Sequence, residues 1–450
     1  MTTRRILVLA DFACATGFAK VAENVVAQLL KETRVSYQID VIGINYFGLP
    51  TQWQKIFPAV RIFPALNVAK GDVFGRSGFM EMIATGAYDF AWILQDTFQI
   101  EPIGQDLIDL RNKLAEAGKK TFRIVYYFPI DATPKENWIK KTVSLFDAPV
   151  VYTEYGKAEC LKIDPELKDR LRVIPHGIDT SVFKPLADRK LVEKFRHDYF
   201  LGFADDKFLI TNVNRNQPRK DIARTLAAFK YVKQQVPEAL LYLHMKSNDV
   251  AYNVKEVARN YELIPEKDFV VPDNFDEHTG FSEDIVNLIY NSSQAVVSTT
   301  LGEGWGLSIT EAMATKVPVV APDHTSIAEI LADGRGLLAK AGSNISEWIT
   351  IQADNERMRP LTNIADMVEK IVYLRNNYKS PEVQGMIEKA YQHVTENWTW
   401  DKIGQTWRDL LYDLASSEKV VKVGRNDPCP ECLKQGKTVK YKHCKEHFRG

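Results

Sequence analysis

The chain passes twice through the same alternation of short apolar runs and amphipathic helical segments, and this doubling constrains its fold most. The first series begins with "RRILVLADF", which predicts a strand, followed by "GFAKVAENVVAQLLKE", whose apolar residues recur at helical spacing. The second series begins with "KFLITNVNR" and "DIARTLAAFKYVKQQV". Because strands that alternate with helices form parallel α/β sheets, the sequence predicts two doubly wound domains.

Further strand candidates are continuously apolar, as is typical of parallel strands covered by helices on both faces. They are "YQIDVIGINY", "FAWILQD", "FRIVYYFPID", "APVVYTEY", "ALLYLHMK", "KDFVVP", "QAVVSTT" and "VPVVAP". Ligands of doubly wound domains bind at the carboxyl ends of strands, so we expect the site in the cleft between the domains. The predicted order is an N-terminal Rossmann-like domain at 1–183, a linker at 184–206, a second Rossmann-like domain at 207–394, a closing helix that packs back on the first domain at 395–417, and a basic tail at 418–450.

Composition excludes several other classes of protein. Of the 450 residues, 45% are hydrophobic and 26% charged, which is typical of a folded globular protein with two or three domains. No apolar run is long enough to span a membrane, and the N-terminal residues lack the apolar core of a signal peptide. We therefore expect a cytoplasmic protein without a membrane span.

The stretch "STTLGEGWGLSITEAMATKVPVVAP" (298–322) carries two glutamates, Glu303 and Glu311, with glycines between them. One interpretation is structural: Ser308 and Glu311 have the spacing of a capping box, which starts a helix. This interpretation leaves Glu303 and Trp305 without a role, although both follow closely after a predicted strand.

The other interpretation of this stretch is a ligand site. A glycine-rich loop that enters a helix presents free backbone N–H groups and the positive end of the helix dipole, which suits a diphosphate. Two carboxylates beside the loop would repel a bare phosphate, but they can accept hydrogen bonds from the hydroxyls of attached sugars. The pattern therefore indicates a nucleoside-diphosphate sugar as the ligand.

The segment "GEGWGLSITEAMA" resembles the E-x7-E signature of retaining glycosyltransferases with the GT-B fold, especially family four, with Glu303 and Glu311 as the two glutamates. Four further segments follow the order found in that family: "ATGFAKVAENV", "VIPHGIDTSVFKP", "VNRNQPRKDIARTLAAF" and "WTWDKIGQTW". The resemblance covers roughly residues 1–415. It implies an α/β protein of the GT-B fold, in which two Rossmann-like, doubly wound domains face a central cleft.

The resemblance also implies roles for individual residues. Arg215 and Lys220 match the family's R-x4-K pair, which contacts the donor diphosphate; such cations can stabilise a leaving phosphate. Arg219, beside this pair, is expected to be only solvated. Glu303 would hold sugar hydroxyls as the third member of the catalytic set. The implied donor-binding residues are Gly17, Gly304, Trp305, Gly306, Leu307 and Glu311, of which Glu311 would bind the ribose.

The chain departs from the family at the end of one N-domain strand, where many members have a histidine near the transferred sugar. Here "YYFPIDATP" offers Asp131, our fourth catalytic candidate, as an acceptor or sugar contact or a base; a role in the turn before Pro134 is the alternative. Asp96 in "LQDTF" has the same two interpretations, and His176 in "IPHGID" is expected to fix the interdomain hinge. The chain has no D-x-D triplet, which favours donor binding without a metal ion.

The tail carries a separate signal. Residues 419–450 contain nine Lys or Arg and three Asp or Glu, whereas the rest of the chain has 49 and 55. Cys429, Cys432, Cys444 and His447 have the spacing of a structural zinc site, with His443 as the alternative fourth ligand. "GRNDPCP" and "YKHC" resemble the SEC-C zinc motif, although this tail has C-x2-C where the motif has C-x-C. The alternative is a disordered tail with incidental cysteines.

The predicted function is a retaining glycosyltransferase that moves a hexosyl or pentosyl group from a nucleoside-diphosphate sugar to an acceptor hydroxyl. The basic tail suits nucleic acid or an acidic protein, so a hydroxymethylated base in DNA, as in phage-type modification, is one predicted acceptor. Small molecules, glycans and proteins are the other acceptors. The rival prediction is a non-catalytic nucleotide-sugar-binding protein with a partner-recruiting tail. A sugar phosphorylase of the same fold finds no support in the sequence.

Overall fold

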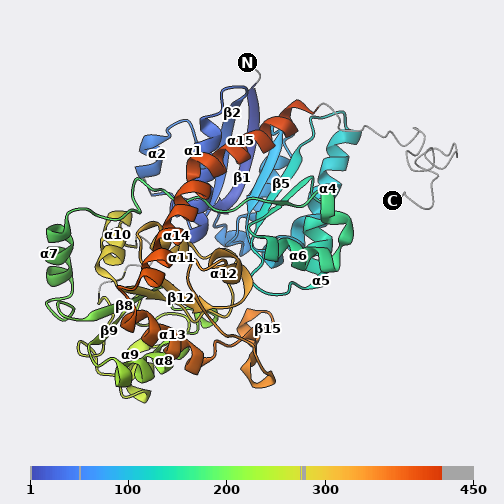
Figure 1. The fold of residues 1–450 in the computed structure, drawn as a ribbon. Coiled ribbons are helices and arrows are strands. Elements are labelled where there is room, and N and C mark those ends of the chain that lie inside the picture. The colour runs from blue at the N-terminus through green and yellow to red at the C-terminus, as the bar shows by residue number, and fades with distance from the viewer. Residues whose placement is uncertain (1–2, 50–51, 274, 276–279, 418–450) are drawn as a thin grey trace. The chain divides into compact units, whose positions relative to one another are not determined.

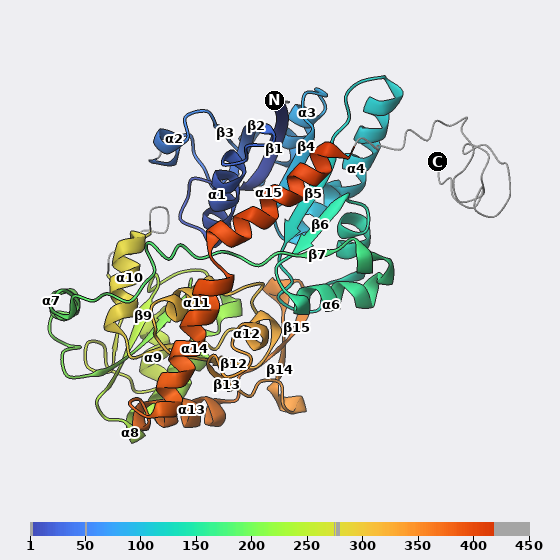
Figure 2. The same ribbon diagram turned by 45° about the horizontal axis from the view of Figure 1, so that its top comes forward.

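The computed structural model describes residues 3–49, 52–273, 275 and 280–417. The described residues up to Arg408 form one compact unit that contains two parallel sheets, each with helices on its faces (Figure 1, Figure 2). The prediction of two parallel, Rossmann-like α/β domains is therefore confirmed. Among the described residues, no helix has the length and apolar character needed to cross a membrane.

The first domain is built on a seven-stranded parallel sheet with the order β3-β2-β1-β4-β5-β6-β7. Across the sheet, successive strands run outward in one direction from β1 to β3 and in the other direction from β4 to β7. The strand order therefore changes direction between β1 and β4, and a ligand crevice is expected beyond the carboxyl ends of these two strands. The strands are β1 (Thr3–Asp11), β2 (Ser36–Ile44), β3 (Arg61–Pro64), β4 (Phe90–Leu94), β5 (Arg123–Phe128), β6 (Ala148–Val151) and β7 (Arg172–Val173). The helices are α1 (Gly17–Leu30), α2 (Gln52–Ile56), α3 (Arg76–Ile83), α4 (Thr97–Glu116), α5 (Glu136–Trp138) and α6 (Glu154–Ile163).

The second domain repeats this plan on a six-stranded parallel sheet with the order β10-β9-β8-β11-β12-β13. Its strands are β8 (Phe208–Val213), β9 (Ala239–His244), β10 (Phe269–Val270), β11 (Ala295–Val297), β12 (Val319–Pro322) and β13 (Leu337–Ala339). The remaining helices are α7 (Arg189–Tyr199), α8 (Ile222–Gln235), α9 (Val254–Asn260), α10 (Glu283–Ser292), α11 (Leu307–Ala314), α12 (Thr325–Ile330), α13 (Ile364–Asn376), α14 (Pro381–Asn397) and α15 (Trp400–Ser416).

Both sheets are buried on both faces, which explains why their strands read as continuous apolar runs. All five residues of β4 and all six of β9 are buried. Burial of this apolar surface is the main force that stabilises each domain, because removal of apolar groups from water is the dominant favourable term in folding.

The segment after β13 forms a structure that the sequence analysis does not predict. After β13 the chain forms an antiparallel hairpin of β14 (Trp348–Ile351) and β15 (Arg357–Pro360), joined through a 3₁₀ turn at Gln352–Asp354. The hairpin interrupts the alternation of strands and helices. It matters for function because it carries Arg357 and Arg359, which reach the first domain.

The closing segment differs from the single helix predicted at 395–417. α14 continues to Asn397, and α15 begins at Trp400. The helix breaks because the chain pairs there with the segment after β7: Ile178 N donates to Trp398 O at 2.7 Å, and Trp400 N donates to Ile178 O at 3.3 Å. Gly177 permits this approach, since a β-carbon on it would lie 2.5 Å from the Trp400 ring.

Candidate active site

Polar residues from both domains lie at the carboxyl ends of the parallel strands. In the first domain Asp96 follows β4, and Pro129–Asp131 follows β5. In the second domain a short 3₁₀ turn, Pro218–Lys220, follows β8, and the glycine-rich loop 302–306 follows β11. Hydrogen bonds link the second-domain segments directly, because Leu301 N donates to Arg219 O at 2.8 Å. This edge of the two sheets is therefore the candidate active site.

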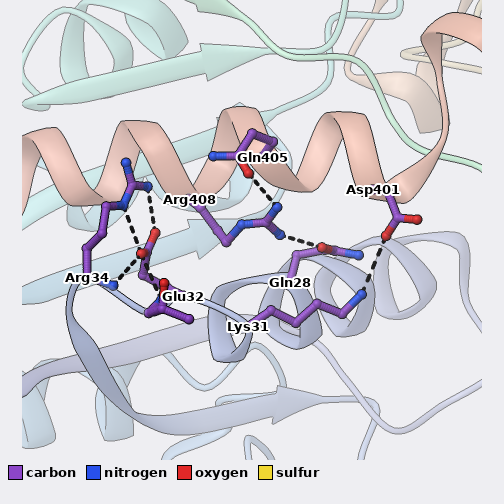
Figure 3. A pocket seen from close by; sticks show the side chains of 8 residues that line it. Gln28, Lys31, Glu32, Arg34, Asp401, Gln405 and Arg408 are labelled. Carbon is purple, nitrogen blue, oxygen red and sulfur yellow. Dashed lines mark hydrogen bonds and ion pairs between the residues drawn. The ribbon is translucent and has the colours of Figure 1, made fainter.

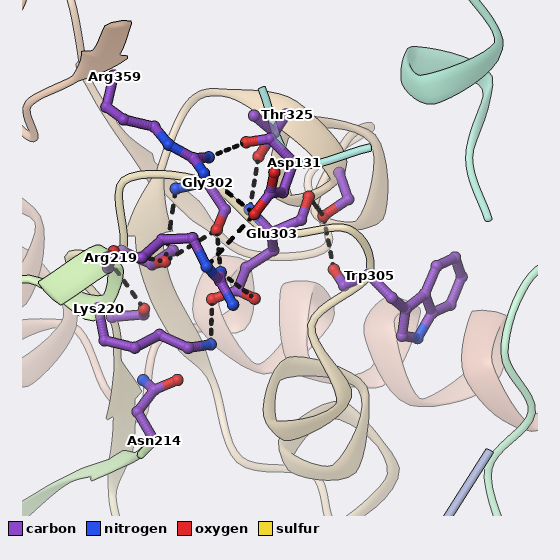
Figure 4. Close-up of polar contacts among 12 residues, drawn as sticks. Asp131, Asn214, Arg219, Lys220, Gly302, Glu303, Trp305, Thr325 and Arg359 are labelled. Carbon is purple, nitrogen blue, oxygen red and sulfur yellow. Dashed lines mark hydrogen bonds and ion pairs between the residues drawn. The ribbon is translucent and has the colours of Figure 1, made fainter. Parts of the chain in front are cut away.

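Glu303 is held by two cations of the same domain (Figure 4). Its carboxylate lies 2.5 Å from Lys220 Nζ and 3.0 Å from Arg219 Nη1, and its side chain is only 10% exposed. Burial would raise the pKa of this carboxyl, but Lys220 and Arg219 outweigh it and lower the pKa to about 2. Glu303 is therefore ionised across the physiological range and can accept hydrogen bonds from hydroxyls.

The loop that carries Glu303 is fixed by the start of α12. Glu303 N donates to Thr325 Oγ1 at 3.2 Å, and the Ser326 hydroxyl donates to Glu303 O at 2.9 Å and to Trp305 O at 2.6 Å. Thr325 has φ +51°, a left-handed conformation that β-branched residues rarely adopt. Such strain persists only where surrounding contacts require it, and here those contacts position Glu303.

The carboxylate of Asp131, in the first domain, lies among three arginine side chains of the second domain. Its carboxylate lies 2.7 Å from Arg357 Nη1, 3.2 Å from Arg359 Nη2 and 3.3 Å from Arg219 Nε. Although burial opposes ionisation, these three cations hold the pKa of Asp131 far below its usual range. The carboxylate is therefore ionised and a weak proton acceptor in this arrangement. Its evident role is to bind the second domain.

Glycines allow the two domains to meet at this point. A β-carbon on Gly302, which has φ +152°, would lie 2.0 Å from Asp131 O, and one on Gly304 would lie 2.5 Å from Pro129 Cβ. Gly17, the first residue of α1, faces the other domain as well, since a β-carbon on it would lie 3.2 Å from Leu307 Cδ1. The glycines of the sequence motif thus permit close interdomain approach.

Glu311 does not act as the capping residue that the structural interpretation predicts. α11 begins at Leu307 with Gly306, at φ +116°, as its N-cap, and no side chain caps it. The Glu311 carboxylate instead accepts hydrogen bonds from Lys20 Nζ at 2.8 Å and from the Tyr290 hydroxyl at 2.9 Å. The capping-box interpretation of Ser308 and Glu311 is therefore wrong, because the Glu311 carboxylate is paired with Lys20 and Tyr290 and does not cap the helix.

Arg215 and Trp305 have different surroundings. Arg215 Nε lies 3.0 Å from Asp249 Oδ2 and its side chain is 52% exposed, so it faces solvent beside the site. Trp305 is buried, with its ring centroid 5.0 Å from that of Trp398 and 5.6 Å from that of His176. Trp305 therefore packs the loop against the segment that joins α14 and α15. The donor-binding roles of both residues remain predictions.

His176 is buried beside three aromatic rings, and its Nδ1 lies 2.6 Å from the Tyr127 hydroxyl. Burial lowers its pKa to about 3, so the ring is neutral at physiological pH. Two of these rings, Tyr127 and Tyr152, come from the first domain, and the third, Trp305, comes from the second. This position agrees with the expected structural role between the domains.

Asp96 lies at the N-cap position of α4, and its side chain makes no capping hydrogen bond. Burial, together with the negative charge of Asp131, raises the pKa of Asp96 to about 7. Burial also raises the pKa of Glu23 to about 7 and raises that of Asp11. Asp11, at the end of β1, and Asp96, after β4, therefore place carboxyl groups with raised pKa values at this edge of the first sheet.

Sequence reasoning missed several residues that build this site. Arg219 was expected to be only solvated, yet it contacts both Glu303 and Asp131. Arg357 and Arg359 alternate in "RMRP", and this spacing places both on one face of a strand, which is the signal that could have found them. Lys20 and Thr325 have no sequence signal, because neither belongs to a local pattern that predicts its contact.

A surface pocket occurs away from these residues, between α1 and the beginning of α15 (Figure 3). Four of its charged side chains form two ion pairs: Lys31 lies 3.5 Å from Asp401, and Arg34 lies 2.7 Å from Glu32. Arg408 Nη1 donates to Gln28 Oε1 at 2.6 Å. These contacts attach the first turns of α15 to the first domain.

Metal ligation is not evident in the described part of the chain, where no group of three or more His, Cys, Asp or Glu side chains has an arrangement that could hold a metal ion. The predicted zinc ligands Cys429, Cys432, Cys444 and His447, and the alternative His443, lie outside the described residues.

Structural comparison identifies the fold. The structure is similar to the crystal structure of HepE from Anabaena in complex with UDP and glucose, with a TM-score of 0.63, 15% identity, and coverage of 91% of this chain and 100% of that chain. It is similar also to sucrose-phosphate synthase from Thermosynechococcus elongatus, with a TM-score of 0.65, 14% identity, and coverage of 93% and 100%. At these identities the likeness shows the fold alone, and that fold is GT-B.

Sequence comparison places the second-domain part of the site within a known family model. Residues 194–359, which include Lys220, Glu303 and Glu311, match the model described as glycosyl transferases group 1. The chain is 25% identical over 263 residues to a probable sucrose-phosphate synthase of Thermosipho melanesiensis and 24% identical over 287 residues to a trehalose synthase of Thermococcus litoralis. These matches cover 57% and 61% of this chain, and they span 51% and 59% of the two relatives.

Proposed function

We propose that this protein is a retaining glycosyltransferase that transfers a sugar from a nucleoside-diphosphate sugar to an acceptor hydroxyl. One observation carries the proposal: within the segment that matches the glycosyl transferases group 1 model, a buried, ionised Glu303 is held by Lys220 and Arg219 at the carboxyl end of β11. The neighbours crystallised with UDP or UDP-glucose support a nucleotide-sugar donor.

In this proposal the second domain binds the donor. The diphosphate lies at the N-terminus of α11, where the first backbone N–H groups have no partner inside the helix and the helix dipole favours an anion. Glu311 accepts hydrogen bonds from the ribose, and Glu303 accepts them from the transferred sugar. Lys220 and Arg215 stabilise the negative charge that develops on the leaving diphosphate.

The acceptor approaches from the first domain, on the face that holds Asp96 and Asp131. In the retaining course, the acceptor hydroxyl attacks from the face of the leaving group, and the departing phosphate receives its proton. This course needs no strong base on the protein, which agrees with the low pKa of Asp131. Donor binding without a metal ion is part of the proposal, because Lys220, Arg215 and the helix supply the positive charge.

We propose a carbohydrate hydroxyl as the acceptor. The carboxyl groups of Asp11, Glu23 and Asp96, whose pKa values are raised by burial, can exchange hydrogen bonds with a polyol, and they supply no positive charge that would attract a polyanion. The curated relatives are named for synthases of sugars. A hydroxymethylated base in DNA is supported only by the charge of the tail, which lies outside the described residues.

The test measures release of nucleoside diphosphate from UDP-, GDP- and ADP-sugars, with mono- and disaccharide acceptors and, separately, with hydroxymethylated duplex DNA. We expect release that depends on a saccharide, and a product whose anomeric configuration, read by NMR, equals that of the donor. An inverted product would contradict the retaining mechanism. Turnover with DNA alone would replace the carbohydrate acceptor, and tight donor binding without any turnover would favour the non-catalytic binding protein.

For the tail we propose structural zinc bound by Cys429, Cys432 and Cys444, with His447 as the fourth ligand. Elemental analysis of the purified full chain is expected to find a single zinc ion per molecule, which is lost on truncation after Ser417 and weakened by His447→Ala. If His443→Ala removes the metal and His447→Ala does not, the fourth ligand is His443. Absence of zinc from the full chain would contradict the proposal.

A further inference from the structure

The N-terminal turns of α1 and α11 face each other across the two domains. Gly17 and Lys20 lie about one turn apart on α1, as do Leu307 and Glu311 on α11. Gly17 packs against Leu307, and Lys20 Nζ donates to Glu311 Oε1 at 2.8 Å. The two helices are therefore joined by an apolar contact and an ion pair at the place where the proposed donor would bind.

The ammonium group of Lys20 contacts three side chains that lie outside the first sheet and its helices. Besides Glu311, its ammonium lies 2.6 Å from Glu283 Oε1 at the start of α10 and 4.2 Å from the centre of the Phe183 ring. Its side chain is 22% exposed and that of Glu311 is 9% exposed. Burial would lower the pKa of Lys20, but the two carboxylates outweigh it and the pKa is raised, so the ammonium is charged.

Each carboxylate oxygen of Glu311 already has a hydrogen-bond donor in this structure. One oxygen accepts from Lys20, and the other accepts from the Tyr290 hydroxyl. A buried carboxylate without a counterion is costly, so this pairing satisfies Glu311 when no ligand is present. A ribose hydroxyl that binds Glu311 Oε1 therefore competes with the Lys20 ammonium for that oxygen.

We propose that Lys20 is a positioning residue of the donor site that occupies Glu311 in the unliganded protein and is displaced by the hydroxyls of the donor ribose. The inference rests on the proposed function, because it assigns a ribose to Glu311. The displaced ammonium can keep its ion pair with Glu283. That carboxylate already contacts it, is 46% exposed at the first residue of α10, and so leaves the ammonium room to move toward solvent. Lys20 thus couples ribose binding to the contact between the two domains, and it sets how strongly the site distinguishes ribose from deoxyribose.

The test compares wild type with Lys20→Met and Lys20→Arg by calorimetric titration of UDP, ADP and GDP into the full chain. We expect Lys20→Met to bind the preferred nucleotide about three- to tenfold more tightly, because the competitor for Glu311 is gone, and Lys20→Arg to resemble wild type. The control is Lys31→Met, at the other end of α1, whose 59% exposed side chain pairs with Asp401; it should change affinity less than about twofold.

The decisive probe is the 2′,3′-dideoxy form of the preferred nucleoside diphosphate, which has no ribose hydroxyls to replace Lys20. Its affinity is expected to be the same in wild type and Lys20→Met. Equal tightening of both nucleotides, or weaker ribonucleotide binding by Lys20→Met, would overturn the inference.

A measurement without ligand separates this inference from the proposed function. Urea unfolding of Lys20→Met, Glu311→Gln and the double variant forms a double-mutant cycle, in which the two changes are expected to be non-additive. If wild type binds none of the three nucleotides, the proposed function fails. The double-mutant cycle then still shows, without any ligand, whether Lys20 and Glu311 interact in the folded protein. Additive effects would show that Lys20 is not the counterion of Glu311 and would overturn the inference.

Discussion

Gly302 and Asp131 are in contact across the two domains so closely that a β-carbon on Gly302 would lie 2.0 Å from the carbonyl oxygen of Asp131. Real β-carbons do not approach a backbone oxygen to this distance. Gly302 also has φ +152°, which L-residues rarely adopt. The residue just before Glu303 is therefore fixed as glycine by the fit of one domain against the other.

Replacement of this glycine should be costly. Gly302→Ala is expected to lower the free energy of unfolding by more than about 2 kcal/mol, because the new methyl group must displace both the Asp131 carbonyl and the Arg359 side chain. The matched control is Gly385→Ala, an exposed position in α14 where a β-carbon meets nothing within 4 Å. That change should be neutral or stabilise by up to about 1 kcal/mol, since alanine favours helix. Urea unfolding checks both, and equal effects would contradict the interdomain fit.

Glu303→Gln should remove most of the transfer activity. The amide keeps the size of the side chain, but it withdraws the negative charge that Lys220 and Arg219 hold in place. We expect kcat to fall by about 10²- to 10³-fold, as for other groups that act on the reacting centre. The assay is nucleotide release with the best donor.

Its control is Glu256→Gln, an exposed glutamate paired only with Arg259 in the described structure, which should leave kcat unchanged. Far-UV circular dichroism shows whether each variant is folded. Full activity in a folded Glu303→Gln variant would remove Glu303 from the catalytic set.

Asp131→Asn should destabilise the protein rather than act mainly on proton transfer. The change leaves the guanidiniums of Arg219, Arg357 and Arg359 without their shared carboxylate, and loss of one partner of a buried ion pair costs about 3 kcal/mol. The control is Asp205→Asn, since Asp205 is exposed and pairs with His197. This change should lower the free energy of unfolding by less than about 1 kcal/mol. Urea unfolding measures both, and a stable but inactive Asp131→Asn variant would restore Asp131 as a base.

Asp96 predicts a pH dependence of stability. Its folded pKa of about 7 lies above the ordinary value of 3.8, so the folded state binds a proton more readily than the unfolded state. The contribution of Asp96 is therefore fully present below about pH 4 and is lost as pH rises through 7. Asp96→Asn removes this loss, because asparagine does not titrate. The Tm of the variant minus the Tm of wild type should therefore be larger at pH 8 than at pH 5. An equal difference at both pH values would contradict the raised pKa.

The sequence by itself determined the two parallel domains and the loop that carries Glu303. These features depend on local patterns: continuous apolar strands, amphipathic helices, and glycines at the entry to α11. Their physical cause acts within about 20 residues, so it can be read along the chain. The short strands β3 and β13 and the hairpin of β14 and β15 were missed, because three or four residues are too few to show a periodicity.

Only the tertiary structure decided what the site residues contact. Lys20 and Glu311 are separated by 291 positions, and Asp131 and Arg359 by 228, so no local spacing predicts either pair. The break between α14 and α15 arises in the same way, from pairing with Ile178. Local sequence fixes which backbone a segment adopts, whereas the charge that neutralises a buried carboxylate comes from whichever segment the packing of the sheets brings beside it.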